Sequence, residues 1–396
     1  MSHSGTGPNH APDHHDHSPG HHRMTGHQGP DTHHAPDNHT SSAAGSHTLR
    51  LVAWETTRRC NLACKHCRAV AEDHPYENEL DTKEAFALLD QIREVGTPII
   101  ILTGGEPLLR EDIFDIAAYG TKIGLRMVMA PNGTLLTRKN VSKLKHSGIK
   151  RISVSLDGAS AGTHDNFRGL ASAFDDALRG IAVAREAGLE FQINTTITKA
   201  NLDEIPKILK LAEELGAVAL HIFLLVPTGR GKYIVDSAID AEEYEQTLNW
   251  FYDQQGKTSL QLKATCAPHY YRILRQRAHA EGKKVSFASH GLDAVTRGCL
   301  AGTGFCFISH VGRVQTCGFL DVTCGDIRQQ SFADVWENSP VFNELRDFSK
   351  LEDKCGICEY KQVCGGCRAR AYEATGSYLA EEPLCSYQPR KKAVSG

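Results

Sequence analysis

Three cysteines in the spacing CxxxCxxC form the motif of this sequence that could most readily carry chemistry. Cys60, Cys64 and Cys67 follow an apolar, β-prone run at 51–57, so we expect them on a loop at the C-terminal end of a strand. Thiolates are the usual ligands of iron–sulfur clusters, and a cubane of four irons takes four of them. Three thiolates leave one iron open for a substrate or cofactor, as on a catalytic metal. Short cysteine spacings are also typical of zinc sites, and this motif alone leaves both interpretations open.

A second motif directly follows another strand-like run, at 99–103, and consists of Gly104, Gly105, Glu106 and Pro107. Glycines let a backbone approach a ligand closely, and a carboxylate beside them suits an ammonium group. Together, CxxxCxxC and GGEP one strand–helix unit later resemble the radical S-adenosylmethionine (SAM) superfamily. The resemblance implies a [4Fe–4S] cluster on the three cysteines, whose open iron is chelated by the amino and carboxylate groups of SAM. It also implies that reduction of this cluster releases a 5′-deoxyadenosyl radical.

Alternating strand and helix patterns fill residues 50 to about 225. Apolar runs predict strands at 51–57, 98–103, 125–130, 150–156, 190–197 and 217–226. Helical patterns lie near 81–96, 111–123, 137–147, 170–187 and 202–215. These repeats predict an α/β fold in which a parallel sheet curls into a partial (β/α)6 barrel. Ligand-binding residues are then expected on loops at the C-terminal ends of the strands.

Other positions match the SAM contacts of the superfamily. Ser155 ends the fourth strand and is implied to face the ribose or carboxylate, and Arg168 matches the arginine that pairs with the SAM carboxylate. Asn132 ends the third strand and is expected to contact SAM, and Asn194 on the fifth strand to face the ribose. His66 occupies the position where the family usually places an aromatic ring near the adenine. Taken singly, each also has an explanation as turn chemistry or strand polarity.

The C-terminal region carries cysteines whose spacing is similar to that of the SPASM extension of radical SAM enzymes. By that resemblance it holds two auxiliary [4Fe–4S] clusters. One would be bound by Cys299, Cys306, Cys317 and Cys367, and the other by Cys355, Cys358, Cys364 and Cys385. The sequence departs from the usual pattern because two residues, not three, precede Cys367. Two zinc knuckles are the alternative, Cys324 is a spare thiol, and Cys266 is expected to be a buried thiol.

Four regions are therefore expected along the 396 residues. They are a disordered His-rich tail at 1–48, the partial barrel at 49–226, a helical or linker extension packing on the barrel at 227–290, and the SPASM-like domain at 291–396. The first region holds twelve of the 21 histidines and almost no large apolar residues, a composition that predicts disorder. Imidazole binds Ni, Zn, Cu and haem iron, so this segment is either a metal-binding tract or a solvated tail.

Two stretches of the sequence, 58–69 and 364–383, reduce the number of candidate radical reactions. They look like the radical SAM enzymes of alternative haem synthesis and their haem d1 relatives, and the start at 51–57 most resembles the decarboxylases of the last step. The resemblance implies a radical SAM oxidoreductase that oxidatively decarboxylates two propionates of iron-coproporphyrin III to vinyl groups, giving haem b. The alternatives are removal of acetate side chains from 12,18-didecarboxysirohaem, modification of a peptide, and a non-catalytic iron–sulfur or haem carrier.

Composition bounds the partners. The net charge of -3 with mixed signs does not indicate nucleic acid, and no apolar run of about 18 residues predicts a membrane span. Without an apolar signal segment, thirteen clustered cysteines favour metal ligation in a reducing cytoplasm over disulfides. The implied partners are iron-coproporphyrin III and a low-potential electron donor of the flavodoxin or ferredoxin type. Candidate clamps for a tetracarboxylate are Arg58, Arg68, Arg230, Lys232 and Arg297.

Overall fold

The fold is that of a computed structural model, which describes residues 47–286 and 296–390. Residues 1–46, which make up most of the tail expected at 1–48, lie outside the described residues. The disorder expected for that tail therefore stays a prediction.

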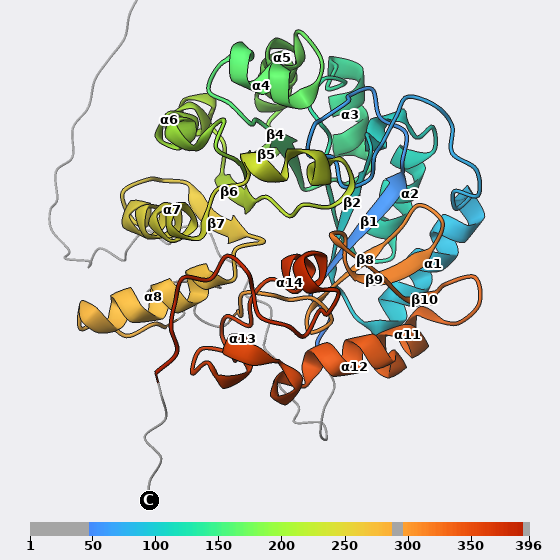
Figure 1. Cartoon of the computed structure of the whole chain (residues 1–396). Helices are drawn as coiled ribbons and strands as arrows, with labels where there is room; N and C mark the ends of the chain where they lie inside the picture. The colour runs from blue at the N-terminus through green and yellow to red at the C-terminus, as the bar shows by residue number, and fades with distance from the viewer. Residues whose placement is uncertain (1–46, 287–295, 391–396) are drawn as a thin grey trace, which may run out of the picture. The chain divides into compact units, whose positions relative to one another are not determined.

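One sheet of ten strands runs through the described chain, in the order β10-β9-β8-β1-β2-β3-β4-β5-β6-β7 (Figure 1). Strands β1 to β7 are parallel, β8 lies parallel beside β1, and β9 and β10 continue the sheet as antiparallel strands. The strands are β1 (Leu51–Thr57), β2 (Ile99–Gly104), β3 (Arg126–Met129), β4 (Arg151–Ser155), β5 (Glu190–Ile197), β6 (Ala219–Leu224), β7 (Gln261–Thr265), β8 (Phe305–Ile308), β9 (Arg313–Cys317) and β10 (Leu320–Asp326). The sheet is not closed, which fits the expected partial barrel.

Helices cover the outer face of the curved sheet (Figure 1). Those of the first part are α1 (Thr82–Val95), α2 (Ile113–Lys122), α3 (Arg138–His146), α4 (Ala161–Arg168), α5 (Ala173–Glu186), α6 (Ile205–Leu215), α7 (Ala241–Gln254) and α8 (His269–Ala280). Those of the second part are α11 (Phe332–Asn338), α12 (Pro340–Arg346), α13 (Asp353–Ile357) and α14 (Arg368–Thr375). Short 3-10 turns are η1 (Pro107–Leu109), η2 (Leu202–Glu204), η3 (Gly229–Ser237) and η4 (Phe348–Lys350).

The two faces of the sheet differ in polarity. Because successive side chains of a strand point to opposite faces, Val52 and Trp54 of β1 join the core under the helices, and Glu55 points the other way. On β4 and β5 the inner face likewise carries polar residues, among them Ser155 and Asn194, which lie opposite each other in the register. Apolar burial thus fixes the strands from outside and leaves polar groups inside the curve.

The structure departs from the expected elements in two places. The single helix expected at 170–187 is preceded by a separate helix, α4, which ends at Gly169 with φ +72°. A Cβ at Gly169 would lie 2.6 Å from the carbonyl oxygen of Ala63, so the cysteine-bearing segment packs closely on this turn. In addition, the extension expected to be helical at 227–290 contributes β7, a seventh parallel strand, because Leu262 and Ala264 alternate with polar residues.

The C-terminal region continues the same sheet. Strand β8 pairs with β1 from Leu51 to Trp54, and its end therefore lies beside the second half of β1, the strand that leads into the cysteine motif. In the described residues no helix has the length and apolar character needed to cross a membrane.

Candidate functional site

The loop that follows β1, residues 58–72, carries Cys60, Cys64 and Cys67 and is called the cysteine loop below. Cys60 and Cys64 are buried. Burial, and then the charges of neighbouring groups that include the other two thiolates, raises the pKa of Cys60 to about 12. The three thiols thus lie together at the C-terminal end of a strand, as the spacing predicts.

The GGEP turn is joined to the backbone just before these cysteines. Gly105 N–H donates to Thr57 O (2.8 Å) and Glu106 N–H to Arg59 O (2.7 Å). A Cβ at Gly104 would lie 2.2 Å from Thr57 O, and one at Gly105 would lie 2.3 Å from Arg59 O. The two glycines therefore permit close packing of two backbones, a role that the sequence did not indicate.

Glu106 is fully buried in this turn. Its carboxylate accepts hydrogen bonds from the backbone N–H groups of Asn132 (2.6 Å) and Leu108 (3.0 Å). Burial outweighs both hydrogen bonds and raises its pKa to about 7. Asn132 in turn directs its side-chain amide to Asn61 (2.8 Å) and to the sulfur of Cys60 (4.0 Å). The end of β3, the GGEP turn and the cysteine loop thus form one hydrogen-bonded unit.

Arg168 ends α4 against the second cysteine. It is buried, pairs with Asp157 (2.5 Å) and directs Nη1 to the sulfur of Cys64 (3.7 Å). Its Nε is buried and has no hydrogen-bond partner in the described residues. Although burial opposes ionisation of Asp157, the charge of Arg168 lowers its pKa below the usual value. One donor of Arg168 is therefore left for a further acceptor beside the cysteine loop.

The remaining expected contacts lie around the same loop. The ring of His66 stacks on Phe167 with 4.3 Å between centroids and an angle of 8°, and its Nδ1 is buried without a partner in the described chain. Burial lowers the pKa of His66 to about 4, so the ring is neutral near pH 7. Ser155 and Asn194 lie on the adjacent strands β4 and β5, and Asn194 accepts a hydrogen bond from Gln192 (2.9 Å). A stacked neutral ring and a polar strand face are suited to a nucleoside.

All five candidate carboxylate clamps have structural partners, and those of Arg230, Lys232 and Arg297 lie apart from Glu55. Arg230 donates to the carbonyl oxygens of Cys64 (2.8 Å) and Ala71 (3.0 Å) and so fastens the cysteine loop. Lys232 pairs with Glu373 (3.0 Å). Arg297 lies over a phenyl ring (3.6 Å) and donates to a backbone carbonyl (3.3 Å). These contacts give each of the three a partner within the described chain, and their pairing with a substrate carboxylate stays a prediction.

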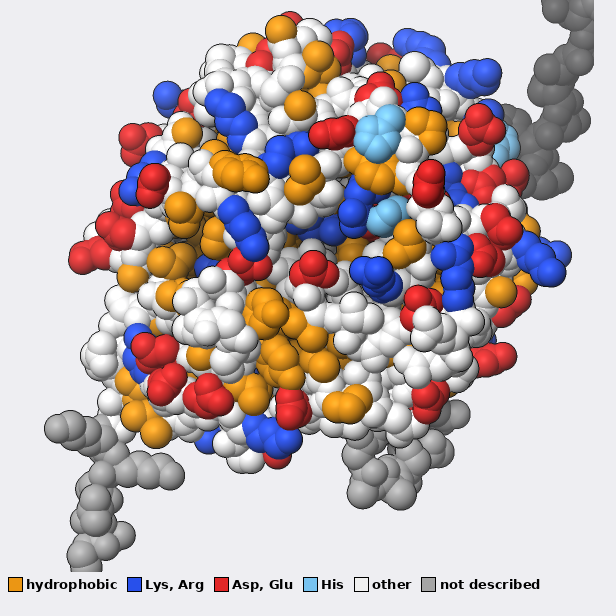
Figure 2. Space-filling view, turned by 45° about the vertical axis from the view of Figure 1, so that its right-hand side comes forward, with side chains coloured by type: hydrophobic (Ala, Val, Ile, Leu, Met, Phe, Trp, Pro, Cys, Tyr) orange, Lys and Arg blue, Asp and Glu red, His pale blue; other side chains and the backbone are white. Residues whose placement is uncertain are grey.

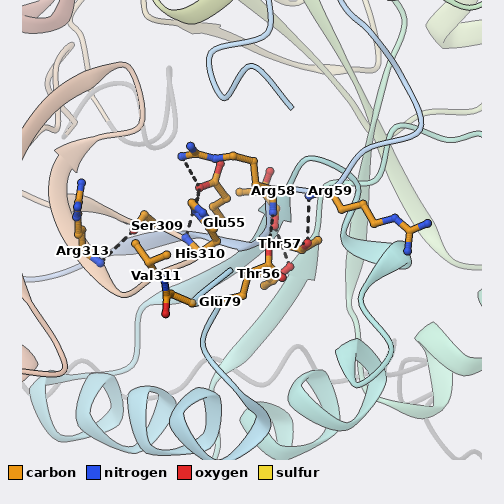
Figure 3. Close-up of polar contacts among 12 residues, drawn as sticks. Glu55, Thr56, Thr57, Arg58, Arg59, Glu79, Ser309, His310, Val311 and Arg313 are labelled. Atoms are coloured by element: carbon orange, nitrogen blue, oxygen red, sulfur yellow. Dashed lines mark hydrogen bonds and ion pairs between the residues drawn. The ribbon is translucent and has the colours of Figure 1, made fainter. Parts of the chain in front are cut away.

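The other two candidates, Arg58 and Arg68, both pair with Glu55, which sequence reasoning missed. Figure 3 shows Glu55 with Arg58 and His310. Glu55 lies at 3.3 Å from Arg58 and 3.4 Å from Arg68, and His310 directs Nδ1 to it at 2.8 Å. Burial opposes its ionisation, but Arg68, His310 and Arg58 outweigh burial and lower the pKa of Glu55 to about 2. The signal available in the sequence was an acidic residue within an otherwise apolar strand.

A pocket in the C-terminal region brings together the second predicted ligand set, called the local cysteine set. Its lining includes Cys355, Cys358, Cys364 and Cys385. Cationic side chains of Arg272, Lys354 and Lys361 line the same pocket, as does His269. Cationic groups of this kind stabilise thiolates and an anionic cluster.

The first predicted ligand set is only partly brought together. Cys317 and Cys367 lie in one apolar cluster with Cys266, and Cys299 is near enough for its charge to act on Cys266; these four thiols are called the dispersed cysteine set. Burial, and then the thiolate charges of the other three members, raises the pKa of Cys266 well above its usual value. Burial also raises the pKa of Cys317 and of Cys367, and the charge of the Cys299 thiolate adds to the rise in both. Cys266 also has φ +53°, a conformation that costs a non-glycine residue on the order of 1–3 kcal/mol and is often found at functional sites.

Cys306 does not lie with those thiols. It is fully buried on β8 in the core under the helices, on the strand face that Ile308 shares. Burial raises the pKa of Cys306, and the charge of the spare Cys324 on β10 raises it further. The sequence pattern had placed Cys306 in the first set and left Cys266 out, because spacing does not show the direction in which a strand residue points.

A buried ion pair supports the dispersed cysteine set. Arg370 Nε lies 2.9 Å from Glu382, and both side chains are almost fully buried. Arg370 donates to the carbonyl oxygen of Cys266 (2.7 Å), and Glu382 accepts the N–H of Cys367 (2.6 Å). The pair therefore fixes the backbone of two of the four cysteines relative to each other.

The donor groups fit iron–sulfur clusters. Three groups of thiols gather in or beside buried positions, and unpartnered donors of Arg168 and His66 lie next to the first of them. Among the described residues no three His, Cys, Asp or Glu side chains converge closely enough for a single metal ion. In a cubane each thiolate binds a different iron, so such convergence is not required.

Comparison with known proteins supports these cofactors. Residues 54–212 match the radical SAM superfamily, and residues 299–368 match an iron–sulfur cluster-binding domain, SPASM. An AdoMet-dependent heme synthase of Nitratidesulfovibrio vulgaris is 56% identical over 347 residues, 88% of this chain and 95% of that protein. One of Methanosarcina barkeri is 57% identical over 343 residues, 87% of this chain and 98% of that protein. The two matching domains imply SAM and iron–sulfur clusters.

A solved structure supports the fold alone. Streptococcus suis SuiB bound to S-adenosylmethionine is similar with a TM-score of 0.69 at 18% sequence identity, covering 86% of this chain and 78% of that one. The arrangement of sheet and helices therefore recurs in a protein of very different sequence.

Proposed function

This chain belongs to the radical SAM superfamily, and from that premise we propose that it oxidatively decarboxylates two propionates of iron-coproporphyrin III to vinyl groups, yielding haem b. The observation that carries the proposal is the identity of 56% and 57% to AdoMet-dependent heme synthases over nearly nine tenths of the chain. The chain is a radical SAM oxidoreductase, and its cysteine loop, its GGEP turn and its C-terminal cysteines from Cys299 to Cys367 lie within the two matched domains.

In this proposal Cys60, Cys64 and Cys67 hold a [4Fe–4S] cluster whose open iron binds SAM. Glu106 accepts the ammonium group of SAM, and the unpartnered Nε of Arg168 donates to its carboxylate. The backbone of the GGEP turn, with Asn132, keeps the cysteine loop in register for both groups. Ser155 and Asn194 face the ribose, and the ring of His66 contacts the adenine.

Two auxiliary clusters follow from the other thiols. The local cysteine set holds one of them in its pocket. The dispersed cysteine set holds the second, with Cys266 in the place that the sequence pattern gave to Cys306. Loss of carbon dioxide from a substrate radical releases an electron, and an auxiliary cluster is the group proposed to accept it.

The chemistry supplied by the bound cofactors is a 5′-deoxyadenosyl radical that removes a hydrogen atom from the propionate β-carbon, after which carbon dioxide and one electron leave to give the vinyl group. The chain's own residues bind, orient and exclude water. The apolar strand faces and helices close the outside of the site, and the polar inner face holds the nucleoside. A low-potential donor of the flavodoxin or ferredoxin type and the reducing cytoplasm complete the proposal.

Anaerobic incubation of the reconstituted protein with SAM, a reductant and iron-coproporphyrin III tests this function. The expected product has lost two carboxyl groups by mass and has the absorption spectrum of haem b. A parallel incubation with 12,18-didecarboxysirohaem tests acetate removal. Turnover of the latter alone, or release of 5′-deoxyadenosine with no mass change in either tetrapyrrole, would reject the proposed reaction.

A further inference from the structure

Glu55 and His310 meet where β1 and β8 end side by side. Glu55 lies on the inner face of β1, and His310 follows β8 by two residues. His310 Nδ1 lies 2.8 Å from Glu55 Oε2, and its backbone N–H donates to the same oxygen at 3.4 Å (Figure 3). Because a carboxylate that is paired with two arginines can only accept a hydrogen bond, the shared hydrogen resides on Nδ1. In the neutral imidazole the other ring nitrogen, Nε2, then carries the lone pair.

That lone pair has no use within the described residues. His310 is 7% exposed, its ring packs edge-on against Tyr76 (5.9 Å), and no hydrogen bond to Nε2 exists in this part of the chain. Nε2 is not completely buried and keeps a small exposed surface. A histidine whose Nδ1–H is held by a carboxylate is the common arrangement of a metal ligand, since the carboxylate fixes the tautomer and makes Nε2 more basic.

Two arginines at the same carboxylate add a site for an anion. Arg58 and Arg68 both pair with Glu55, so two guanidinium groups share this carboxylate. Arg58 Nε is buried and has no acceptor in the described chain. Arg68 is held by its guanidinium lying over Phe307, 4.2 Å from the ring centroid. Figure 2 shows Lys, Arg and His side chains gathered around a recess in the middle of one face.

A ligand with a metal and a carboxylate close together matches both features. We propose that His310 binds the iron of the iron–porphyrin substrate through Nε2 as an axial ligand, and that Arg58 and Arg68 pair with one of its carboxylates. The inference rests on the proposed function for the identity of the substrate. Arg68 is the residue after Cys67, so a porphyrin held here lies beside the cysteine loop.

Axial ligation can be observed without turnover. Ferric iron-coproporphyrin III is added to the full-length protein without SAM, and optical absorption and electron paramagnetic resonance (EPR) spectra report the iron ligand. The wild-type protein is expected to give a histidine-ligated spectrum. His310→Ala is expected to lose it, and His310→Met to replace it with a thioether-ligated one. His74→Ala, a change in an exposed histidine whose ring stacks on Tyr76, is the matched control and keeps the wild-type spectrum.

Affinity separates iron binding from damage to the fold. His310→Ala is expected to weaken the binding of iron-coproporphyrin III by about tenfold or more and to leave the binding of metal-free coproporphyrin III unchanged. Glu55→Gln is expected to weaken the binding of iron-coproporphyrin III by roughly tenfold. Equal weakening for both porphyrins, or an unchanged iron spectrum in His310→Ala, would overturn the inference; the second result assigns ligation to another histidine. Decarboxylation by the wild-type protein alongside such a result leaves the proposed function standing. Histidine ligation without any decarboxylation rejects the proposed function instead.

Discussion

The local and dispersed cysteine sets solve the same problem in different ways. Three of the four local thiols lie between residues 355 and 364 on one turn-rich segment, and α8 adds His269 and Arg272 to the lining of their pocket. The dispersed thiols come from residues 266 to 367 and meet only because β7, β9 and α14 converge. The comparison teaches that short spacing specifies a site locally, whereas a site with long spacing depends on the fold.

The largest expected effect separates Cys266 from Cys306. Cys266→Ala is expected to remove one of three clusters, about a third of the bound iron, because its thiol lies with the other three members of the dispersed set. Cys306→Ala is expected to keep all the iron, since that thiol lies in the apolar core. Iron analysis and EPR of the reduced, reconstituted proteins measure both. The reverse result would restore the ligand set given by the sequence pattern.

The next expected effect concerns how each set is supported. Arg370→Met leaves Glu382 buried without its partner, and we expect the free energy of unfolding to fall by about 3–5 kcal/mol. The same change should reduce the EPR signal of the dispersed set, because Arg370 also holds the carbonyl of Cys266. Arg272→Met beside the local set is the matched variant, and its partner Glu245 is partly exposed.

Urea unfolding of the cluster-free proteins, followed by circular dichroism, measures both variants. A smaller loss is expected for Arg272→Met, since water can solvate the carboxylate that remains. Equal losses in the two variants would show that the dispersed set does not depend on its buried ion pair.

The smallest expected effect concerns the cysteine loop. The carboxyl group that supports this loop, that of Glu106, has a pKa near neutrality. Burial raises the pKa of Glu106 to about 7. Below that pH the carboxyl group of Glu106 must therefore lose its proton before it can pair with an ammonium group. The affinity for SAM should therefore fall by roughly tenfold from pH 8 to pH 6. Calorimetric titration at several pH values measures this dependence.

Glu106→Gln is the matched variant, because it keeps the shape of the side chain. It should bind SAM more weakly and with little dependence on pH over the same interval. A wild-type affinity that does not change between pH 8 and pH 6 would exclude Glu106 as the acceptor of the ammonium group.

The sequence predicted the repeated strand–helix units of the fold and those site residues that lie close together in the sequence. The six strands from 51 to 226 lie within about two residues of the expected positions, because their apolar runs are long and bounded by turns. The three loop cysteines and the GGEP turn lie together as expected. Strand β7 was missed because it is a short run in which apolar and polar residues alternate.

Residues whose role depends on distant partners could not be predicted. Glu55 and His310 are 255 positions apart and become neighbours only through the pairing of β1 with β8. The alternation of strand faces turns Cys306 toward the core and thus away from the cluster-binding side. Arg230, a candidate clamp for a substrate carboxylate, also fastens the cysteine loop by donating to the carbonyl oxygen of Cys64, a contact between residues 166 positions apart.

The most direct test of the account uses iron-coproporphyrin III that carries deuterium on the propionate β-carbons. Anaerobic turnover with SAM is predicted to place deuterium in 5′-deoxyadenosine while the porphyrin gains vinyl groups, and Cys64→Ala is predicted to abolish both products. Formation of haem b with 5′-deoxyadenosine free of deuterium would contradict radical abstraction at that carbon, and with it the proposed function.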